Sequence, residues 1–246
     1  MRLFGLIGYP LVQSFSQRFF TEKFRQLGLA DCFFQNFPIT AIEEFPGLLQ
    51  QYPELEGVAV TIPYKQVVLP YLNNTTNIPQ GLNACNCIRI KSNQLTGFNT
   101  DYIGFEKSFT PLLQPHHQRA LILGNGGSTA AVAFVLEKYN IGFKIVSRQS
   151  HDGSALAYAD IDKQTLAEHP VIINTTPLGM FPNVDACPDI PYQWLTQDNY
   201  LYDLVYNPAK TLFLQKGEER GAIIKNGADM LEIQAEENWR IWNYGR

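Results

Sequence analysis

The sequence lacks the features of secreted, membrane-bound and nucleic-acid-binding proteins. Its four cysteines, among 246 residues, have neither Cys-x-x-Cys spacing nor the density of a disulfide scaffold, which favours reduced thiols in a cytoplasm. No apolar run approaches the length of a membrane span, and the run after Met1 is too short for a signal peptide. The net charge of −4 provides no basic field for nucleic acid or an anionic membrane, so a small-molecule partner is favoured.

The sequence also has no internal repeat, low-complexity segment or charge run. An apolar content of 45% with 17% charged residues is typical of a soluble globular protein. The length allows one large domain or two domains of ordinary size, each with a substantial core.

The first hundred residues alternate expected strands with expected helices. The pattern predicts strands over residues 3–7, over 33–39 and from Gly57, and helices capped by Ser16, over 42–52 and from Pro63. Such alternation is typical of a parallel sheet covered on both faces. Residues 87–90 and 94–98 flank Ser92-Asn93 and predict an antiparallel hairpin, after which the first domain is expected to end near residue 100.

Residues 120–136 predict the opening of a dinucleotide-binding βαβ unit. An apolar run at residues 121–123 is followed by Gly124-Asn125-Gly126-Gly127 and then by a helix-forming segment. Glycines at such a junction permit a tight turn with positive φ and let the backbone come close to a ligand. The N–H groups of the helix favour an anion such as a pyrophosphate. Because glycine-rich turns also occur without a ligand, the motif alone leaves the nucleotide interpretation open.

Further strands are expected over residues 143–148, 171–176 and 200–206, with helices over 103–112 and 230–242. Arg148 ends the first of these strands, where an NAD site usually has Asp or Glu, and a planar cation there suits a 2′-phosphate. Asp152, four residues later, keeps NAD open as an alternative. The next expected strand, near 154–158, follows too closely for a crossover helix, which predicts an extended loop or a rearranged sheet edge.

Two charged residues are candidates for catalysis. Lys65 is expected in the first turn of a helix, where a cation opposes the macrodipole, and it is either a solvated surface lysine or an ammonium at the carboxyl ends of the strands, where ligands bind. Asp101 is either a helix cap or a partner of Lys65. Ser14 and Ser16 have the same ambiguity, because hydroxyls near a helix start serve the backbone or bind a polyol or carboxylate.

These motifs together resemble the shikimate dehydrogenase family across nearly the whole chain. The matching segments, in the family's order and spacing, are Gly8-x-Pro10 with Ser14-Phe15-Ser16, Val60-Thr61-Ile62-Pro63-Tyr64-Lys65, Ala84-Cys85-Asn86-Cys87, Asn99-Thr100-Asp101, Gly124-Asn125-Gly126-Gly127, Ser147-Arg148, residues 173–180, residues 203–208 and residues 227–234. Each segment alone is a weak signal, whereas their common order is a strong one.

The resemblance implies two α/β domains: a substrate-binding domain of residues 1–101 plus 228–246, and a Rossmann-like NADP-binding domain of residues 102–227 with a shortened crossover. It implies NADP-dependent, reversible reduction of 3-dehydroshikimate to shikimate on the route to chorismate and the aromatic amino acids, with no metal. Lys65 and Asp101 would be the catalytic pair. The substrate residues would be Ser14, Ser16, Thr61, Asn86, Tyr206 and Gln234. The cofactor residues would be Gly124, Asn125, Gly126, Gly127, Ser147, Arg148, Thr175, Leu204, Gly227 and Met230.

The chain also departs from the family pattern. Phe15 replaces a lysine often found between the two serines, Gln17 a proline and Tyr102 a glycine, and Asp152 stands where a second basic residue often supports the 2′-phosphate. The alternatives are therefore a quinate/shikimate dehydrogenase that uses NAD, or a non-catalytic ligand sensor, against which the intact Lys65 and Asp101 argue. The sequence is consistent with both a monomer and a homodimer.

Overall fold

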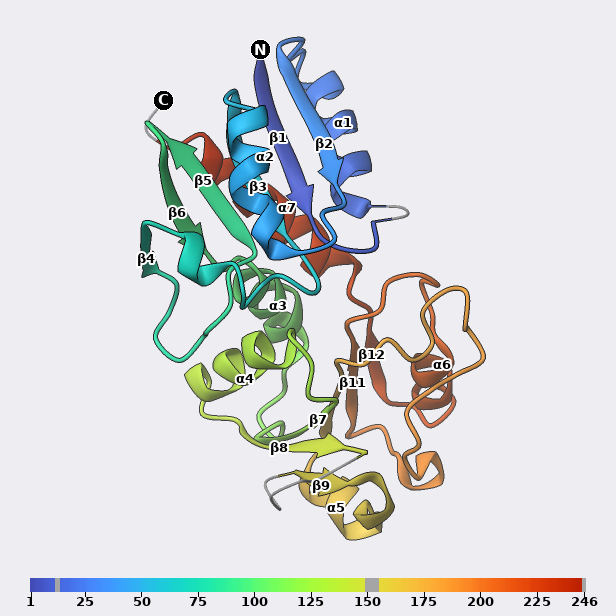
Figure 1. Cartoon of the computed structure of the whole chain (residues 1–246). Helices are drawn as coiled ribbons and strands as arrows, with labels where there is room; N and C mark the ends of the chain where they lie inside the picture. The colour runs from blue at the N-terminus through green and yellow to red at the C-terminus, as the bar shows by residue number, and fades with distance from the viewer. Residues whose placement is uncertain (12–13, 149–154, 245–246) are drawn as a thin grey trace. The chain divides into compact units, whose positions relative to one another are not determined.

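The structure is a computed structural model, and it describes residues 1–11, 14–148 and 155–244 (Figure 1). The chain divides into two compact units, one made of Met1–Asp101 with Gln234–Arg246 and the other of Tyr102–Ile233. The expected boundary at residue 228 is the first residue of the C-terminal helix α7 (Ala228–Trp242), whereas the units divide within that helix. No helix of the described residues is both long and apolar enough to cross a membrane.

The first unit contains a mixed six-stranded sheet of order β2-β1-β3-β5-β6-β4. The strands are β1 (Arg2–Ile7), β2 (Cys32–Phe37), β3 (Leu55–Val60), β4 (Asn74–Asn77), β5 (Cys87–Lys91) and β6 (Gln94–Phe98). The expected parallel pairing is found for β1 with β2 and β3, whereas β5 runs antiparallel to β3 and β6. The predicted hairpin is confirmed, and both residues of its turn, Ser92 and Asn93, have a positive φ, as a type I′ turn requires.

Alternate residues of β1 pack on opposite faces of this sheet. Leu3 and Ile7 belong to the core beneath α2 (Phe45–Gln51). Phe4 and Leu6 belong to the core beneath α1 (Phe15–Gln26) and α7, where the Phe4 ring stacks on Trp242 at 5.0 Å between centroids. Figure 1 shows α2 and α7 on opposite sides of the sheet. The unit therefore has three layers, with the carboxyl ends of β1, β2 and β3 at one edge.

Two helix predictions in this unit are wrong. Residues 61–68 form isolated turns, in which Tyr64 N–H donates to the Thr61 carbonyl and Val68 N–H to the Tyr64 carbonyl, and only the short 3₁₀ helix η2 (Leu69–Tyr71) follows. Lys65 therefore does not oppose a helix macrodipole. Helix α1 begins at Phe15 and is capped by Ser14, whose Oγ accepts from Gln17 N–H at 3.0 Å, so Ser16 lies inside the helix. The helix expected over 42–52 is η1 (Ile42–Glu44) followed by α2.

The second unit contains a parallel six-stranded sheet of order β12-β11-β10-β7-β8-β9. The strands are β7 (Arg119–Leu123), β8 (Gly142–Ser147), β9 (Leu156–Ala157), β10 (Val171–Asn174), β11 (Tyr200–Asp203) and β12 (Ile223–Lys225). The helices are α3 (Asp101–Phe109), η3 (Thr110–Leu112), α4 (Thr129–Lys138), η4 (Tyr158–Asp160), α5 (Lys163–Glu168), η5 (Tyr192–Trp194) and α6 (Leu212–Glu218). Numbered from β7, this is the Rossmann order 3-2-1-4-5-6, which reverses direction between β7 and β10.

The edge strand β9 keeps its Rossmann position despite a short connection. It pairs in parallel with β8, with Val146 opposite Leu156 and Ser147 opposite Ala157. Residues 149–154, which include Asp152, lie outside the described residues. Since β8 ends at Ser147 and β9 begins at Leu156, the connection is shorter than the dozen residues that a crossover helix needs. The predicted fold class, two α/β domains with a shortened crossover, is confirmed.

Candidate functional site

Lys65 and Asp101 form an ion pair in the first unit. Lys65 Nζ donates to Asp101 Oδ2 at 2.7 Å, and the two side chains are only 15% and 11% exposed. Asp101 is the first residue of α3, and the turn that carries Lys65 is tied to the segment before β5, because the Lys65 carbonyl accepts from Cys85 N–H at 2.7 Å. The fold thus pairs two residues that the sequence separates by 36 positions.

Asn86 holds the second oxygen of that carboxylate. Its Nδ2 donates to Asp101 Oδ1 at 2.8 Å and to Thr100 Oγ1 at 3.0 Å, while its Oδ1 accepts from Thr100 N–H at 2.6 Å. The backbone of Asn86 bridges β3 and β6, since its carbonyl accepts from Val60 and its N–H donates to Phe98. Asn86 is only 3% exposed, so this amide sets the orientation of the Asp101 carboxylate from a rigid part of the sheet.

Gln234 joins the same network from α7. Its Oε1 lies 3.4 Å from both Asn86 Nδ2 and Asn238 Nδ2, and Asn238 Oδ1 in turn accepts from Thr100 Oγ1 at 2.7 Å. Sequence analysis did not select Thr100 or Asn238. Thr100 lies within a selected motif, while Asn238 is a buried polar residue on the same face of α7 as Gln234, four positions away.

The other substrate candidates of this unit follow the carboxyl ends of β1 and β3. Thr61 N–H donates to the Ile7 carbonyl at 3.0 Å, and a Cβ at Gly8 would lie 2.4 Å from Thr61 Cγ2, so these two strand exits touch. Ser14 and Ser16 open α1, which follows β1, and both are partly exposed. Tyr206 belongs to the second unit, after β11, and is also partly exposed.

The arrangement around Lys65 suits proton transfer to an oxygen atom. An ammonium has three donors, and the pairing with Asp101 uses one of them. The carboxylate holds the ammonium in place, so the remaining N–H donors of Lys65 keep a fixed position. A cation held in this way stabilises negative charge developing on a carbonyl oxygen and supplies the proton that the oxygen takes up.

The glycine-rich loop of the second unit joins β7 to α4. Gly124 has φ +110°, and a Cβ there would lie 2.8 Å from Thr175 Oγ1, so both the backbone and the packing require glycine. A Cβ at Gly126 or Gly127 would meet nothing within 4 Å, and neither residue has a left-handed φ. Protein contacts therefore explain the first glycine of the motif but not the other two.

Thr129, which sequence analysis did not select, shapes this loop. Its Oγ1 accepts from Gly126 N–H at 3.1 Å and lies 3.1 Å from Thr175 Oγ1, which donates to the Leu123 carbonyl. A threonine at a helix start is the sequence signal that indicates such a role. Among the described residues, none accepts a hydrogen bond from the backbone N–H of Asn125, Gly127 or Ser128. These donors precede the positive end of α4, which suits an anion.

Ser147 and Arg148 lie at the carboxyl end of β8, beside the glycine-rich loop, because Gly124 N–H donates to the Val146 carbonyl at 2.8 Å. Arg148 is exposed. The register of β8 with β9 places it near Tyr158, and burial raises the pKa of the Tyr158 phenol while the Arg148 charge opposes that rise.

Leu204, Gly227 and Met230 follow β11 and β12. A Cβ at Gly227 would lie 2.2 Å from the Leu204 carbonyl oxygen, so this glycine allows two backbone segments to touch. Met230 is 7% exposed and packs in the core with Phe105 and Phe109. Contact of these three residues with a cofactor stays a prediction. Across residues 1–11, 14–148 and 155–244, no group of three or more His, Cys, Asp or Glu side chains is placed to hold a metal ion.

Comparison with known proteins identifies relatives for both units. The family model described as shikimate dehydrogenase substrate binding domain matches residues 6–88. The NADP(+) shikimate dehydrogenase of Methanococcus aeolicus is 31% identical, with 98% of this chain and 91% of the relative covered. That of Nostoc sp. is 34% identical, with 98% and 90% covered. A crystal structure of the Thermus thermophilus shikimate 5-dehydrogenase in complex with NADP(H) and shikimate superposes with a TM-score of 0.85 at 27% identity, covering 99% of this chain and 94% of that one.

Proposed function

The chain belongs to the shikimate dehydrogenase family, and we propose that it catalyses the NADP-dependent, reversible reduction of 3-dehydroshikimate to shikimate. This reaction is a step of chorismate and aromatic amino-acid biosynthesis. The observation that carries the proposal is the buried pair of Lys65 and Asp101, held by Asn86, in a chain whose full length matches NADP-dependent relatives.

In this proposal Lys65 acts on the oxygen of the carbonyl that is reduced. NADPH, when bound, supplies the hydride. The Lys65 ammonium donates a hydrogen bond to the carbonyl oxygen, stabilises the negative charge that develops there and gives the oxygen its proton. Asp101 holds the ammonium at 2.7 Å and presents an acceptor to a neighbouring ring hydroxyl. In the oxidation direction the same pair removes the hydroxyl proton.

The remaining substrate residues in the proposal come from both units. They are Ser14, Ser16, Thr61, Asn86, Tyr206 and Gln234. Hydroxyls and amides both donate and accept, which matches a substrate with several ring hydroxyls and a carboxylate. Thr61 follows β3, and the two serines follow β1. Their positions support this assignment, because ligands bind at the carboxyl ends of parallel strands.

The second unit fits a dinucleotide phosphate. The backbone N–H groups of Asn125 and Gly127 are available to the pyrophosphate, and the space beside Gly126 and Gly127 that a Cβ would occupy allows its close approach. Arg148, with Ser147, would bind the 2′-phosphate of NADP, since a guanidinium pairs with phosphate in a planar fork. Thr175, Leu204, Gly227 and Met230 complete the proposed cofactor set.

The test is a spectrophotometric assay of nicotinamide reduction with shikimate or quinate, each paired with NADP or NAD. Turnover confined to shikimate with NADP is the expected result. Preference for quinate or NAD would support the alternative quinate/shikimate dehydrogenase, to which Asp152 points. Binding of shikimate and NADP without turnover would support a ligand sensor instead.

We further propose a cytoplasmic location, which the cysteines support. Cys32, Cys85, Cys87 and Cys187 are all free thiols, and the first three are buried. Burial raises the pKa of Cys85 to about 12 and that of Cys87 well above its ordinary value, so neither forms a reactive thiolate at neutral pH. Such packed thiols suit a reducing compartment.

A further inference from the structure

The segments that follow β10 and β11 carry three of the residues proposed for ligand binding. Thr175 comes directly after β10, and Leu204 and Tyr206 come after β11. In a sheet of this order a dinucleotide spans the strands on either side of the reversal, here β7 and β10. The glycine-rich loop and Arg148 serve the adenosine and phosphate half, so the ends of β10 and β11 serve the nicotinamide half.

Asp203, the last residue of β11, is the hydrogen-bond centre of these segments. It is fully buried, at 0% exposure. Its Oδ1 accepts from Asn174 Nδ2 at 2.9 Å and from Val205 N–H at 3.0 Å, and its Oδ2 accepts from Thr211 Oγ1 at 2.5 Å. No salt bridge to Asp203 is present in the described part of the chain. The carboxylate is therefore held by three neutral donors.

The donors come from both segments, since Asn174 ends β10, whereas Val205 and Thr211 lie between β11 and α6. Asn174 shapes the turn after β10, because its Oδ1 accepts from Thr176 N–H at 3.0 Å and from Thr176 Oγ1 at 2.6 Å. Val205 N–H fixes the backbone next to Tyr206. Thr211 caps α6, and its Oγ1 also accepts from Leu214 N–H.

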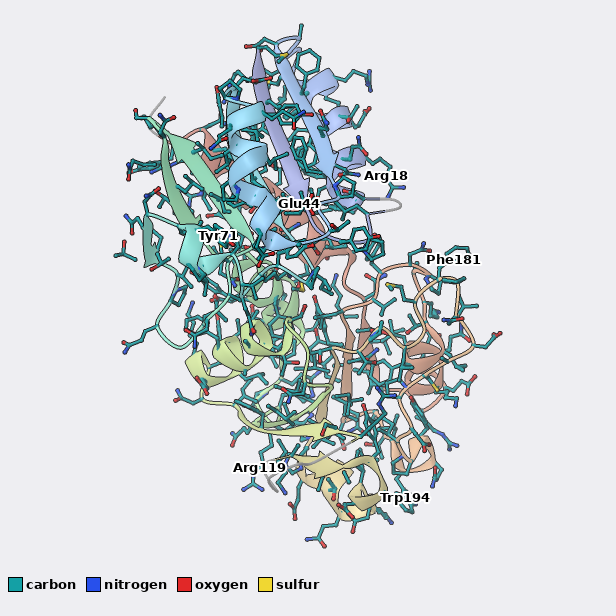
Figure 2. The ribbon with its side chains drawn as sticks, viewed as in Figure 1. Arg18, Glu44, Tyr71, Arg119, Phe181 and Trp194 are labelled. Atoms are coloured by element: carbon teal, nitrogen blue, oxygen red, sulfur yellow. The ribbon has the colours of Figure 1, made fainter. Side chains whose placement is uncertain are left out.

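A further bond links the same two segments beyond Asp203. Phe181 N–H donates to the Asn207 carbonyl at 3.0 Å, while the Phe181 side chain projects from the surface (Figure 2) with 66% exposure. The bond from Phe181, like the bond from Leu204 N–H to the Asn174 carbonyl at 3.0 Å, joins backbone groups, whereas the tie through Asp203 uses a charged group.

We propose that Asp203 is a positioning residue, whose ionised carboxylate holds the segments after β10 and β11 in the arrangement that binds the nicotinamide half of NADP. The inference rests on the proposed function. It explains why an acid is buried without a cation, an arrangement that is costly compared with an apolar residue. Only the ionised form accepts from all three groups, because Oδ1 already takes the two N–H donors, and an amide or a protonated acid would place a donor instead of an acceptor against the Thr211 hydroxyl.

The test replaces the acid by its neutral isostere, Asp203→Asn. Dissociation constants are measured by calorimetry for NADP and for adenosine 2′,5′-bisphosphate, which contains only the adenosine and phosphate groups of the first half. We expect the dissociation constant of NADP to rise about tenfold or more, because the Asn Nδ2 group replaces Oδ2 and the buried Thr211 hydroxyl loses its acceptor. The constant for the bisphosphate should stay at the wild-type value. Unchanged NADP binding, or an equal loss for both ligands, would overturn the inference.

Asp162→Asn is the matched control. Asp162 is an exposed N-cap in the same unit, where it accepts from Thr165 N–H at 2.7 Å, and Asn serves equally well as a cap. This variant should bind both ligands as the wild type does. If it lost NADP affinity as Asp203→Asn does, the effect would not be specific to Asp203.

Thr211→Val and Thr211→Ser keep the inference testable if Asp203→Asn does not fold. Thr211→Val removes one donor to the carboxylate and should weaken NADP but not the bisphosphate, whereas Thr211→Ser keeps the hydroxyl and should bind both normally. Equal binding of NADP by the two variants would overturn the inference. If the wild type itself did not bind NADP, the proposed function would fail, which is a distinguishable result.

Discussion

Gly126→Ala and Gly127→Ala test whether these glycines are needed for cofactor binding or for folding. The added Cβ meets no atom within 4 Å, and neither glycine has a left-handed φ, so the folded protein accommodates the methyl group without strain. A compatible Gly→Ala change stabilises a protein by about 0.4–1 kcal/mol, because it restricts the unfolded chain. We therefore expect each variant to have a melting temperature equal to or slightly above that of the wild type.

Cofactor binding should change in the opposite direction. If a pyrophosphate lies against the backbone N–H groups of this loop, the methyl group occupies the space through which the phosphate oxygens approach. Loss of even one charge-assisted hydrogen bond is worth about 1.5–3 kcal/mol, which corresponds to about a 10-fold to 150-fold increase in the dissociation constant for NADP. The two measurements are thermal unfolding without ligand and calorimetric titration with NADP.

Two other glycines provide controls for these measurements. Gly47 lies in α2 of the first unit and also has no atom within 4 Å of an added Cβ, so Gly47→Ala should stabilise the protein and leave NADP binding unchanged. Gly227→Ala would place a Cβ 2.2 Å from the Leu204 carbonyl oxygen, and it should lower the free energy of unfolding by about 1–3 kcal/mol. If Gly126→Ala and Gly127→Ala both bound NADP with wild-type affinity, the loop would not be the phosphate site.

Three further predictions concern charged groups. Lys65→Ala should lower kcat by about 10²–10⁴-fold, because it removes the proton donor, while circular dichroism shows an unchanged fold; near-normal turnover would exclude the proposed role. Arg148→Ala should raise KM for NADP about tenfold or more and leave KM for NAD unchanged, and equal losses would refute a 2′-phosphate contact. Burial raises the pKa of Asp203 from 3.8 to about 6, so the folded state binds this proton more tightly than the unfolded state does. Protonation of Asp203 therefore adds at most about 3 kcal/mol to the free energy of unfolding below pH 4, and this contribution is lost as the pH rises through 6. Urea unfolding of the wild type and Asp203→Asn from pH 4 to 7 should show this loss in the wild type alone, and parallel curves would contradict it.

Local patterns in the sequence predict the longer elements well. The apolar run of β7, the glycines after it and the helical spacing of α4 are consecutive residues, and each follows from local chemistry. The hairpin of β5 and β6 is also local, because Ser92 and Asn93 tolerate the positive φ that its turn needs.

Short elements do not carry enough residues for a period to be visible. Strands β4 and β12 and helices α5 and α6 were not expected from the sequence, and β12 has only three residues. Its strand conformation comes from pairing with β11, whose Tyr200 lies opposite Ile223. The helix expected from Pro63 is wrong for a related reason: the residues after Pro63 are bound in separate turns, one of them tied to Cys85 through the Lys65 carbonyl.

The sequence by itself determined the family, the order of the motifs and the residue types available for chemistry, because these depend on the chain alone. The tertiary structure decided which of those residues meet. Lys65 and Asp101, Asn86 and Gln234, and Asn174 and Asp203 are each pairs from segments that the sequence separates. Their contacts depend on strand pairing and packing across the sheet, where the free energy comes from non-local burial that no local pattern of residues encodes.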